Sequence, residues 1–141
     1  MAEANAFAHL APTPTPETKP FWEGTHRREL LLPRCRSCGK YHFYPRSLCP
    51  FCWSNDLEWI KASGKGKLHT FSIAQRPVLG IPAPFIAAIV ELAEGPRIAT
   101  NIVGVELDPK NLRCDMEVEV TFEDLTETIT LPKFRLATKA A

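Results

Sequence analysis

Four cysteines in two Cys-x-x-Cys pairs constrain the fold of this chain more than any other feature. The pairs are Cys35 with Cys38 and Cys49 with Cys52, and ten residues separate them. Each pair can form a knuckle that points two thiolates at one ion, and four thiolates complete a tetrahedral structural zinc site. Because four protein ligands leave no position for water, we expect the metal to hold the fold together and not to catalyse a reaction.

The residues after each pair bear on the choice between zinc and iron. Gly39 suits a tight turn whose backbone N–H groups point at sulfur, as in rubredoxin-type iron sites. Trp53 stands where such iron sites usually have glycine, and no second redox element occurs in the sequence, so zinc is favoured over an iron redox carrier. The histidines are scattered and are not needed as ligands: His9, His26, His42 and His69.

Size and composition are those of a small globular protein. The chain has 141 residues, of which 45% are hydrophobic and 23% charged, and these values predict one domain or two small fused modules. No apolar run approaches the roughly 20 residues that span a bilayer, and the N-terminus lacks the order of a signal peptide. We therefore expect a cytoplasmic protein without a membrane partner, in a reducing compartment that leaves its cysteines to the metal.

The sequence divides into three segments. Residues 1–19 are rich in Ala, Pro and Thr and predict a flexible tail. Residues 20–62 predict a short helix and a zinc ribbon, in which Pro20 suits the first turn of a helix that runs to Glu29. The ribbon strands are expected at Leu30–Leu32, at Tyr41–Tyr44 as the return strand, and at Leu57–Ile60.

Residues 63–141 predict a β barrel that begins after the Gly64-Lys-Gly66 turn. The clearest strand is Met116–Glu123, where apolar and polar side chains alternate with the period of a strand that buries one face. Five strands without a convincing helix between them predict a mainly β fold with a five-stranded OB-type Greek-key barrel, and a compact open sandwich is the alternative. The other strands are expected at Lys67–Arg76, Phe85–Ala93, Arg97–Val105 and Ile129–Leu136.

Several motifs, in this order, resemble one family of proteins. The family combines a rubredoxin-like zinc ribbon with an OB-fold and is labelled domain of unknown function thirty-five. The resemblance covers about residues 20–136. The motifs are Pro20-Phe21-Trp22, Leu32-Pro33-Arg34-Cys35, Tyr44-Pro45-Arg46, Cys49-Pro50-Phe51-Cys52, Gly64-Lys-Gly66, Val90-Glu91-Leu92, Glu94-Gly95-Pro96-Arg97 and Leu131-Pro132-Lys133-Phe134.

The resemblance implies a noncatalytic accessory subunit that forms a hetero-oligomer with a thiolase-superfamily enzyme. It also implies an acyl-CoA thioester as a ligand of the complex, while the catalytic groups belong to the partner. The family often has glycine at the turn before Met116. This chain has Leu112-Arg-Cys-Asp there, so the turn at Cys114 departs from the pattern.

Candidate ligand and partner residues follow from local chemistry. Lys65 and Lys67 are the first candidates for contacts to CoA phosphates, although a ribbon-to-barrel turn also explains Gly64-Lys-Gly66. The apolar loop Val78–Pro84 is a candidate for an acyl channel or a partner surface. Phe21 and Trp22 would either dock on a partner or pack within the chain.

No catalytic residue is assigned: Cys114 lacks a neighbouring histidine in sequence, and Glu117, Glu119 and Glu123 are expected on the outer strand face.

A different class of function is single-stranded nucleic-acid binding, because OB-folds and zinc ribbons both serve it. The segment from Glu17 to Lys67 carries ten Lys and Arg against five Asp and Glu, but the remainder to Ala141 carries seven against ten. With a net charge of +1, nucleic-acid binding ranks below the acyl-CoA reading. Aromatic residues that would stack on bases or cover the ribbon core are Tyr41, Phe43, Tyr44, Trp53 and Trp59.

Overall fold

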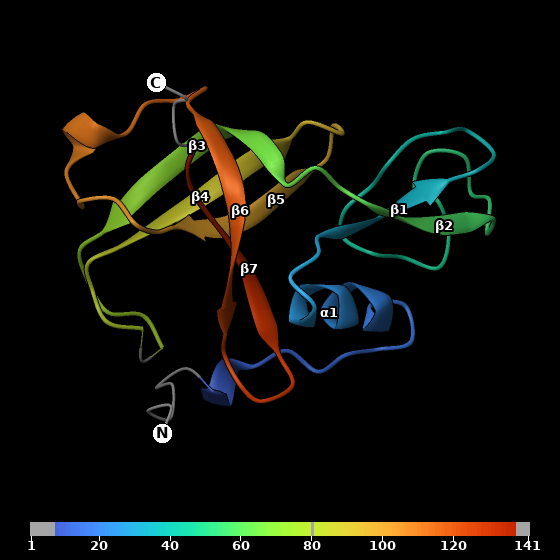
Figure 1. Cartoon of the computed structure of the whole chain (residues 1–141), viewed down its shortest axis with the longest axis horizontal. Coiled ribbons are helices and arrows are strands. Elements are labelled where there is room, and N and C mark those ends of the chain that lie inside the picture. The colour runs from blue at the N-terminus through green and yellow to red at the C-terminus, as the bar shows by residue number, and fades with distance from the viewer. Residues whose placement is uncertain (1–7, 80, 138–141) are drawn as a thin grey trace.

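The computed structural model describes residues 8–79 and 81–137. A two-stranded ribbon and a barrel lie side by side, and helix α1 (Lys19–His26) lies next to both (Figure 1). No helix in the described residues is long and apolar enough to cross a bilayer. The remaining elements are η1 (Ala8–Leu10), β1 (Leu31–Cys35), β2 (Leu57–Lys61), β3 (Lys65–Ala74), β4 (Phe85–Leu92), β5 (Arg97–Ile102), η2 (Pro109–Asn111), β6 (Glu117–Asp124) and β7 (Thr130–Leu136).

Strands β3 to β7 close into a barrel in the order β3-β4-β5-β7-β6, and β6 pairs back onto β3. All neighbours are antiparallel except β5 and β7, which meet in parallel at Ile102 and Phe134. The predicted mainly β fold with a five-stranded OB-type barrel is therefore confirmed, and closure of the sheet rules out the open sandwich.

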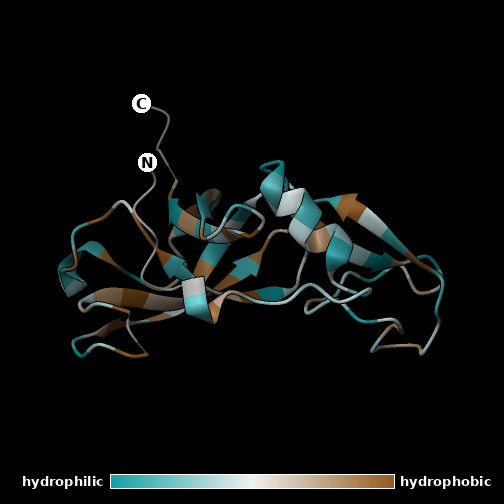
Figure 2. Ribbon diagram, turned by 90° about the horizontal axis from the view of Figure 1, so that it is seen from below, coloured by the Kyte–Doolittle hydropathy of each residue, from teal (hydrophilic) through white to brown (hydrophobic). Residues whose placement is uncertain are grey.

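Alternation of side chains explains why the barrel strands form. In β4, Ile86, Ala88, Val90 and Leu92 are buried, while Glu91 is exposed. This period of two places one face of each strand in the core. Hydrophilic and hydrophobic residues accordingly alternate along the barrel strands in Figure 2. In β6, Val118 is buried as predicted, and Val120 and Phe122 pack against the core while partly buried, as does Met116 directly before the strand.

The predicted return strand at Tyr41–Tyr44 is wrong. Strand β1 pairs with β2 over its whole length, from Leu31 opposite Lys61 to Cys35 opposite Leu57. On the other side of β1, the described part of the chain forms a single bridge, between Arg34 and Tyr41, and the His42 N–H donates to the Pro33 carbonyl. Pro33 has no N–H with which to return that bond, so a regular ladder cannot continue on this side.

Helix α1 begins where Pro20 predicted but ends at His26, before the predicted Glu29. The reason is a backbone reversal at Arg28, which has a φ of +65°. The Glu29 N–H donates to the Gly24 carbonyl across this turn, a bond typical of helix C-termini that end in a left-handed residue. This turn directs the chain into β1.

The helix, the ribbon and the barrel share one hydrophobic core. Phe21 and Trp22 leave only 1% and 8% of their surfaces exposed, and their ring centroids lie 4.9 Å apart. They belong to the same buried cluster as Leu32 of the ribbon and Phe134 of the barrel. The structure thus answers one open question from the sequence: the aromatic pair packs within the chain and does not form a partner surface.

A polar clamp also ties the end of α1 to the barrel. The Arg28 guanidinium donates two hydrogen bonds to the Asp124 carboxylate, of 2.8 and 3.0 Å. The Thr130 hydroxyl, which is buried, donates to the same carboxylate at 2.7 Å. The Arg28 and Thr130 hydrogen bonds hold the pKa of Asp124 well below its usual range.

We predict that Phe21→Ala destabilises the isolated chain by about 3–5 kcal/mol, because it leaves a cavity in the shared core. Equilibrium denaturation measures this loss. The matched control is Phe51→Ala, whose ring is 55% exposed and whose removal should cost much less. A Phe21→Ala protein as stable as the control would contradict the buried placement of the helix.

Asp124→Asn should lower the thermal stability most at pH 7, and the loss should become steadily smaller as the pH falls below about 4. The folded-state pKa of Asp124 is depressed, so its stabilising contribution is present above the unfolded pKa of about 3.9 and is lost as the pH falls through the folded value. Melting curves from pH 7 to pH 2 test this. Glu127→Gln, at an exposed carboxylate nearby in sequence, is the control and should leave the melting temperature at pH 7 nearly unchanged.

Candidate metal centre and ligand-binding surfaces

The four cysteines converge on one point. Their sulfur atoms all lie within 4.8 Å of one another, with 3.5 Å between Cys35 and Cys52 and 3.6 Å between Cys38 and Cys49. Tetrahedral zinc with Zn–S bonds of about 2.3 Å would separate its sulfurs by about 3.8 Å. Cys35 and Cys49 are buried, whereas Cys38 and Cys52 are exposed. The spacing of the cluster therefore fits a four-thiolate metal.

Both knuckles supply backbone donors to sulfur. The Cys38 N–H lies 3.5 Å from the Cys35 sulfur, and the Phe51 N–H lies 3.4 Å from the Cys49 sulfur. The Cys38 N–H is the main reason that the pKa of the Cys35 thiol is lowered to about 6. Because metals bind thiolate and not thiol, a lowered pKa prepares this residue for coordination.

The two knuckles end alike despite different residues. Gly39 and Trp53, each directly after a pair, have φ values of +76° and +65°. The tight turn predicted at Gly39 thus also forms at Trp53, although a bulky residue adopts that backbone region at some cost. Trp53 is 77% exposed, so burial of its side chain within this chain does not offset the free-energy cost of the strained backbone.

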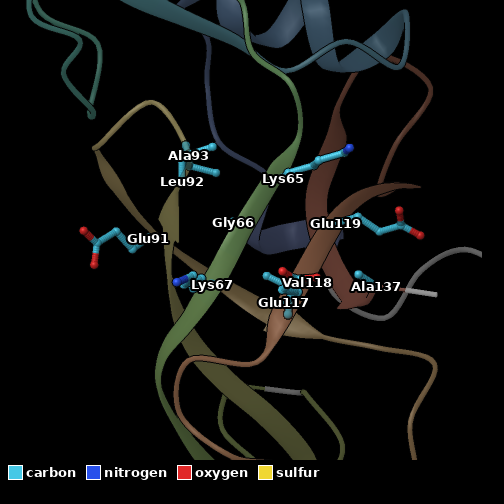
Figure 3. A pocket seen from close by; sticks show the side chains of 10 residues that line it. All are labelled: Lys65, Gly66, Lys67, Glu91, Leu92, Ala93, Glu117, Val118, Glu119 and Ala137. Atoms are coloured by element: carbon cyan, nitrogen blue, oxygen red, sulfur yellow. The ribbon is translucent and has the colours of Figure 1, made fainter. Parts of the chain in front are cut away.

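Lys65 and Lys67, the predicted phosphate contacts, project from β3 among carboxylates (Figure 3). Lys65 lies opposite Glu119 on β6, and Lys67 lies opposite Glu117 on β6 and Glu91 on β4. These five side chains line one cavity of about 600 Å³. Two of these carboxylates have other partners, because Glu91 pairs with Arg97 and Glu119 with Arg135. The phosphate assignment stays an untested prediction.

The glycines beside these lysines have structural roles. Gly64 has a φ of +77°, and a Cβ there would lie 2.5 Å from the Val120 side chain. A Cβ at Gly66 would lie 2.6 Å from the Glu91 carbonyl oxygen. The Gly64-Lys-Gly66 motif therefore serves close strand packing at the entry to the barrel.

The remaining sequence candidates lie apart from one another. Cys114 is exposed, and the left-handed residue of its turn is Asp115, with a φ of +68°. Asp tolerates that conformation better than most residues, so the turn forms without the family's glycine. Val78 and Leu79 are exposed at the β3–β4 loop, whose Gly80 lies outside the described residues.

Only some of the aromatic residues considered for base stacking are available. Tyr44 and Trp53 are 50% and 77% exposed. Tyr41, Phe43 and Trp59 are partly buried and pack against the core cluster. The latter three thus mainly cover the ribbon core, which was the alternative reading of these residues.

One cavity at the junction of ribbon and barrel was not anticipated from the sequence. It has a volume of about 1020 Å³ and contains His42, a residue that is only 3% exposed. Burial, and to a smaller extent the charge of Arg46, lowers the pKa of His42. The ribbon side carries Lys40 and Arg46, which belong to the basic half of the sequence. The barrel side is formed by the β4–β5 turn. No local sequence pattern indicated that this turn lies close to the ribbon.

Comparisons with known proteins assign both parts of the chain. Residues 22–58 match the family description "ChsH2, rubredoxin-like zinc ribbon domain", and residues 59–123 match "ChsH2, C-terminal OB-fold domain". A "DUF35 domain-containing scaffold protein" of Methanothermobacter thermautotrophicus is 36% identical over 115 residues, 79% of this chain and 85% of that protein. These matches agree with the ribbon and barrel seen in the structure.

Relatives with other names share the same region. "Benzoylsuccinyl-CoA thiolase subunit BbsA" of Thauera aromatica is 36% identical over 88 residues, 62% of this chain and 59% of that protein. A "Probable enoyl-CoA hydratase alpha subunit" of Thermomonospora curvata is 34% identical over 119 residues, which are 83% of this chain but only 37% of that protein. Among solved structures, a chain of "Ltp2-ChsH2(DUF35) aldolase" superposes with a TM-score of 0.81 and 30% identity, covering 90% of this chain and 99% of that one.

Fold and comparisons together define a two-part protein, a rubredoxin-like zinc ribbon with a four-cysteine cluster followed by an OB-fold barrel. The chain belongs to the DUF35 family.

We predict about one zinc per chain in protein purified without chelator, with Cys35→Ser losing the metal and unfolding the ribbon. Four thiolates occupy all the coordination positions of the metal, so the free energy of metal binding contributes to the stability of the folded ribbon. Elemental analysis and thiol titration measure this. Cys114→Ser is the matched control and should keep the metal. Metal-free protein with four freely titratable ribbon thiols, or a predominance of iron, would contradict the zinc assignment.

Proposed function

We propose that this chain is a noncatalytic accessory subunit of a thiolase-superfamily enzyme, which it stabilises and for which it helps to bind an acyl-CoA thioester. The observation that carries the proposal is the similarity, over nearly the whole chain, to the DUF35 component of an aldolase complex. The similarity to a subunit of benzoylsuccinyl-CoA thiolase supports the same class of partner. The chain spans only 37% of the length of the hydratase alpha subunit that it matches. We therefore do not assign a hydratase activity to this chain.

In this proposal the partner supplies the reacting groups. Cys114 is exposed on a turn, and no hydrogen bond joins its thiol to a base within the described residues. Glu119 accepts a hydrogen bond from Arg135, and Glu123 pairs with Lys133, so these carboxylates have local structural partners. A nucleophile beside an oriented base, which acyl transfer by a free-standing enzyme would use, is thus not assembled around these candidates.

The two parts have different roles in the proposed complex. A structural zinc at Cys35, Cys38, Cys49 and Cys52 holds the ribbon of residues 20–62, and the barrel of residues 63–141 shapes access to the partner's active site. A cytoplasmic location remains a prediction from the sequence.

The second knuckle is the proposed docking surface for the thiolase-superfamily partner. Phe21 and Trp22 are buried and are not available for this role. In contrast, Leu48 is 42% exposed and Trp53 is 77% exposed, one on each side of the Cys49–Cys52 pair. Large exposed aromatic residues are frequent anchors of protein interfaces. The strained backbone of Trp53 is also typical of positions retained for function.

Co-expression with a thiolase-superfamily protein from the same organism tests the proposal. We expect a stable complex and acyl-CoA turnover by the complex but not by the isolated chain. Trp53→Ala should weaken the complex at least about tenfold while leaving the melting temperature of the isolated chain nearly unchanged, because the residue is a surface anchor.

Leu107→Ala is the matched control, because it removes an exposed apolar residue from the loop between β5 and β6 and should not affect assembly. Turnover by the highly purified isolated chain would contradict the accessory role. A complex equally strong with Trp53→Ala and Leu107→Ala would contradict docking through the second knuckle.

A further inference from the structure

The cavity between ribbon and barrel, here called the junction groove, combines positive charge with aromatic surfaces. Its cations are Lys40 and Arg46 from the ribbon and Arg97 from the barrel. Arg97 is 3.8 Å from Glu91, whereas Arg46 forms no ion pair within the described residues. The Lys40 ammonium lies 4.9 Å from the centre of the Phe51 ring. The groove is also lined by Glu91 and Glu94, but no ion pair joins either carboxylate to Lys40 or Arg46 within the described residues.

Two polar groups in the junction groove are buried without a partner. His42 is 3% exposed, and neither of its ring nitrogens has a hydrogen-bond partner within the described residues. One carboxylate oxygen of Glu94 is likewise unpartnered there, while the other accepts from the Ser63 N–H at 3.1 Å. Leaving such groups unpaired is costly. A ligand that satisfied both would have to offer an acceptor to His42 and a donor to Glu94.

A second, apolar cavity of about 310 Å³ neighbours the junction groove. Both cavities are lined by Phe43 and Tyr44, so these two side chains lie between them. The walls of the second cavity are mainly apolar and include Ile98 of β5 and Leu131 of β7. A ligand that fills both cavities would have an anionic, hydrogen-bonding end and an apolar chain.

We propose that the junction groove binds the phosphorylated nucleotide end of the acyl-CoA thioester. Lys40 and Arg46 attract its phosphates, and the exposed faces of Tyr44 and Phe51 pack against the base. A nucleotide supplies phosphate oxygens as acceptors and ribose or base groups as donors, which an inorganic anion does not. The apolar chain then passes Phe43 into the second cavity. This inference rests on the proposed function and moves the phosphate contacts away from Lys65 and Lys67.

The experiment titrates the full zinc-loaded chain with adenosine 3′,5′-bisphosphate, CoA and octanoyl-CoA by calorimetry. We expect the bisphosphate and CoA to bind, octanoyl-CoA to bind more tightly than CoA, and the Lys40→Ala, Arg46→Ala double variant to weaken all three at least about tenfold. The Lys65→Ala, Lys67→Ala double variant removes the same charge elsewhere and should leave affinity unchanged. Zinc content and melting temperature of both variants show that the fold is kept.

Two further measurements separate the sources of the ligand. His42→Gln, which keeps a donor in the groove, should retain more affinity than His42→Phe. Inorganic phosphate, octanoate, AMP and a single-stranded oligonucleotide serve as competitors, and each should displace octanoyl-CoA only weakly. Tight binding of AMP with no gain from the octanoyl chain would assign the groove to free nucleotides, and preferred binding of the oligonucleotide would assign it to nucleic acid. Either result would overturn the proposal.

Assembly with the thiolase-like partner is measured in the same variants. Two results would show that the groove assignment is wrong while the accessory role stands. In the first, the complex forms but the chain does not bind CoA. In the second, the complex forms and CoA binding is lost in the Lys65→Ala, Lys67→Ala variant but kept in the Lys40→Ala, Arg46→Ala variant. If the isolated chain binds CoA through the groove but no complex forms, the accessory role is wrong and the groove assignment stands.

Discussion

Four sulfur atoms within 4.8 Å of one another are the arrangement on which the rest of the structure depends. Four thiolates at that separation repel one another unless a cation lies between them, so the ribbon requires its metal to stay closed. The ribbon has only one two-stranded sheet, and much of the apolar surface near it belongs to the core shared with the barrel. The backbone N–H groups at both knuckles help to lower the pKa of Cys35 and of Cys49, which favours the thiolate form of these two ligands.

The position of the ribbon relative to the barrel follows from two contacts of different kinds. Apolar packing of Phe21 and Trp22 joins helix, ribbon and barrel in one core, and the Arg28–Asp124 clamp holds the end of the helix at β6. This placement brings the segment around His42 beside the β4–β5 turn and so creates the junction groove. The groove is thus a consequence of how the two parts are packed, and it has no counterpart within either part alone.

An accessory role agrees with how the chain distributes its polar groups. Many carboxylates of the barrel pair with basic residues on neighbouring strands, as Glu119 does with Arg135 and Glu123 with Lys133. Within the described residues, the buried side-chain polar atoms without partners are instead the Trp22 indole nitrogen in α1 and atoms of His42 and Glu94 at the junction groove. Exposed apolar residues flank the second knuckle. Such a chain has surfaces suited to a partner and a ligand, and the exposed Cys114 is not among the residues that line the junction groove.

The sequence by itself determined the features that depend on local spacing. The four cysteines predicted the knuckles, and apolar alternation such as that of Met116–Glu123 predicted the barrel strands, because neighbours in sequence are also neighbours in these elements. Tertiary structure alone decided which strand pairs with β1, where the absent N–H of Pro33 stops the ladder on one side. It also decided that Phe21 and Trp22 are buried, that Lys65 and Lys67 face carboxylates, and that His42 lies in a groove. These outcomes depend on contacts between residues far apart in the chain, which no local pattern records.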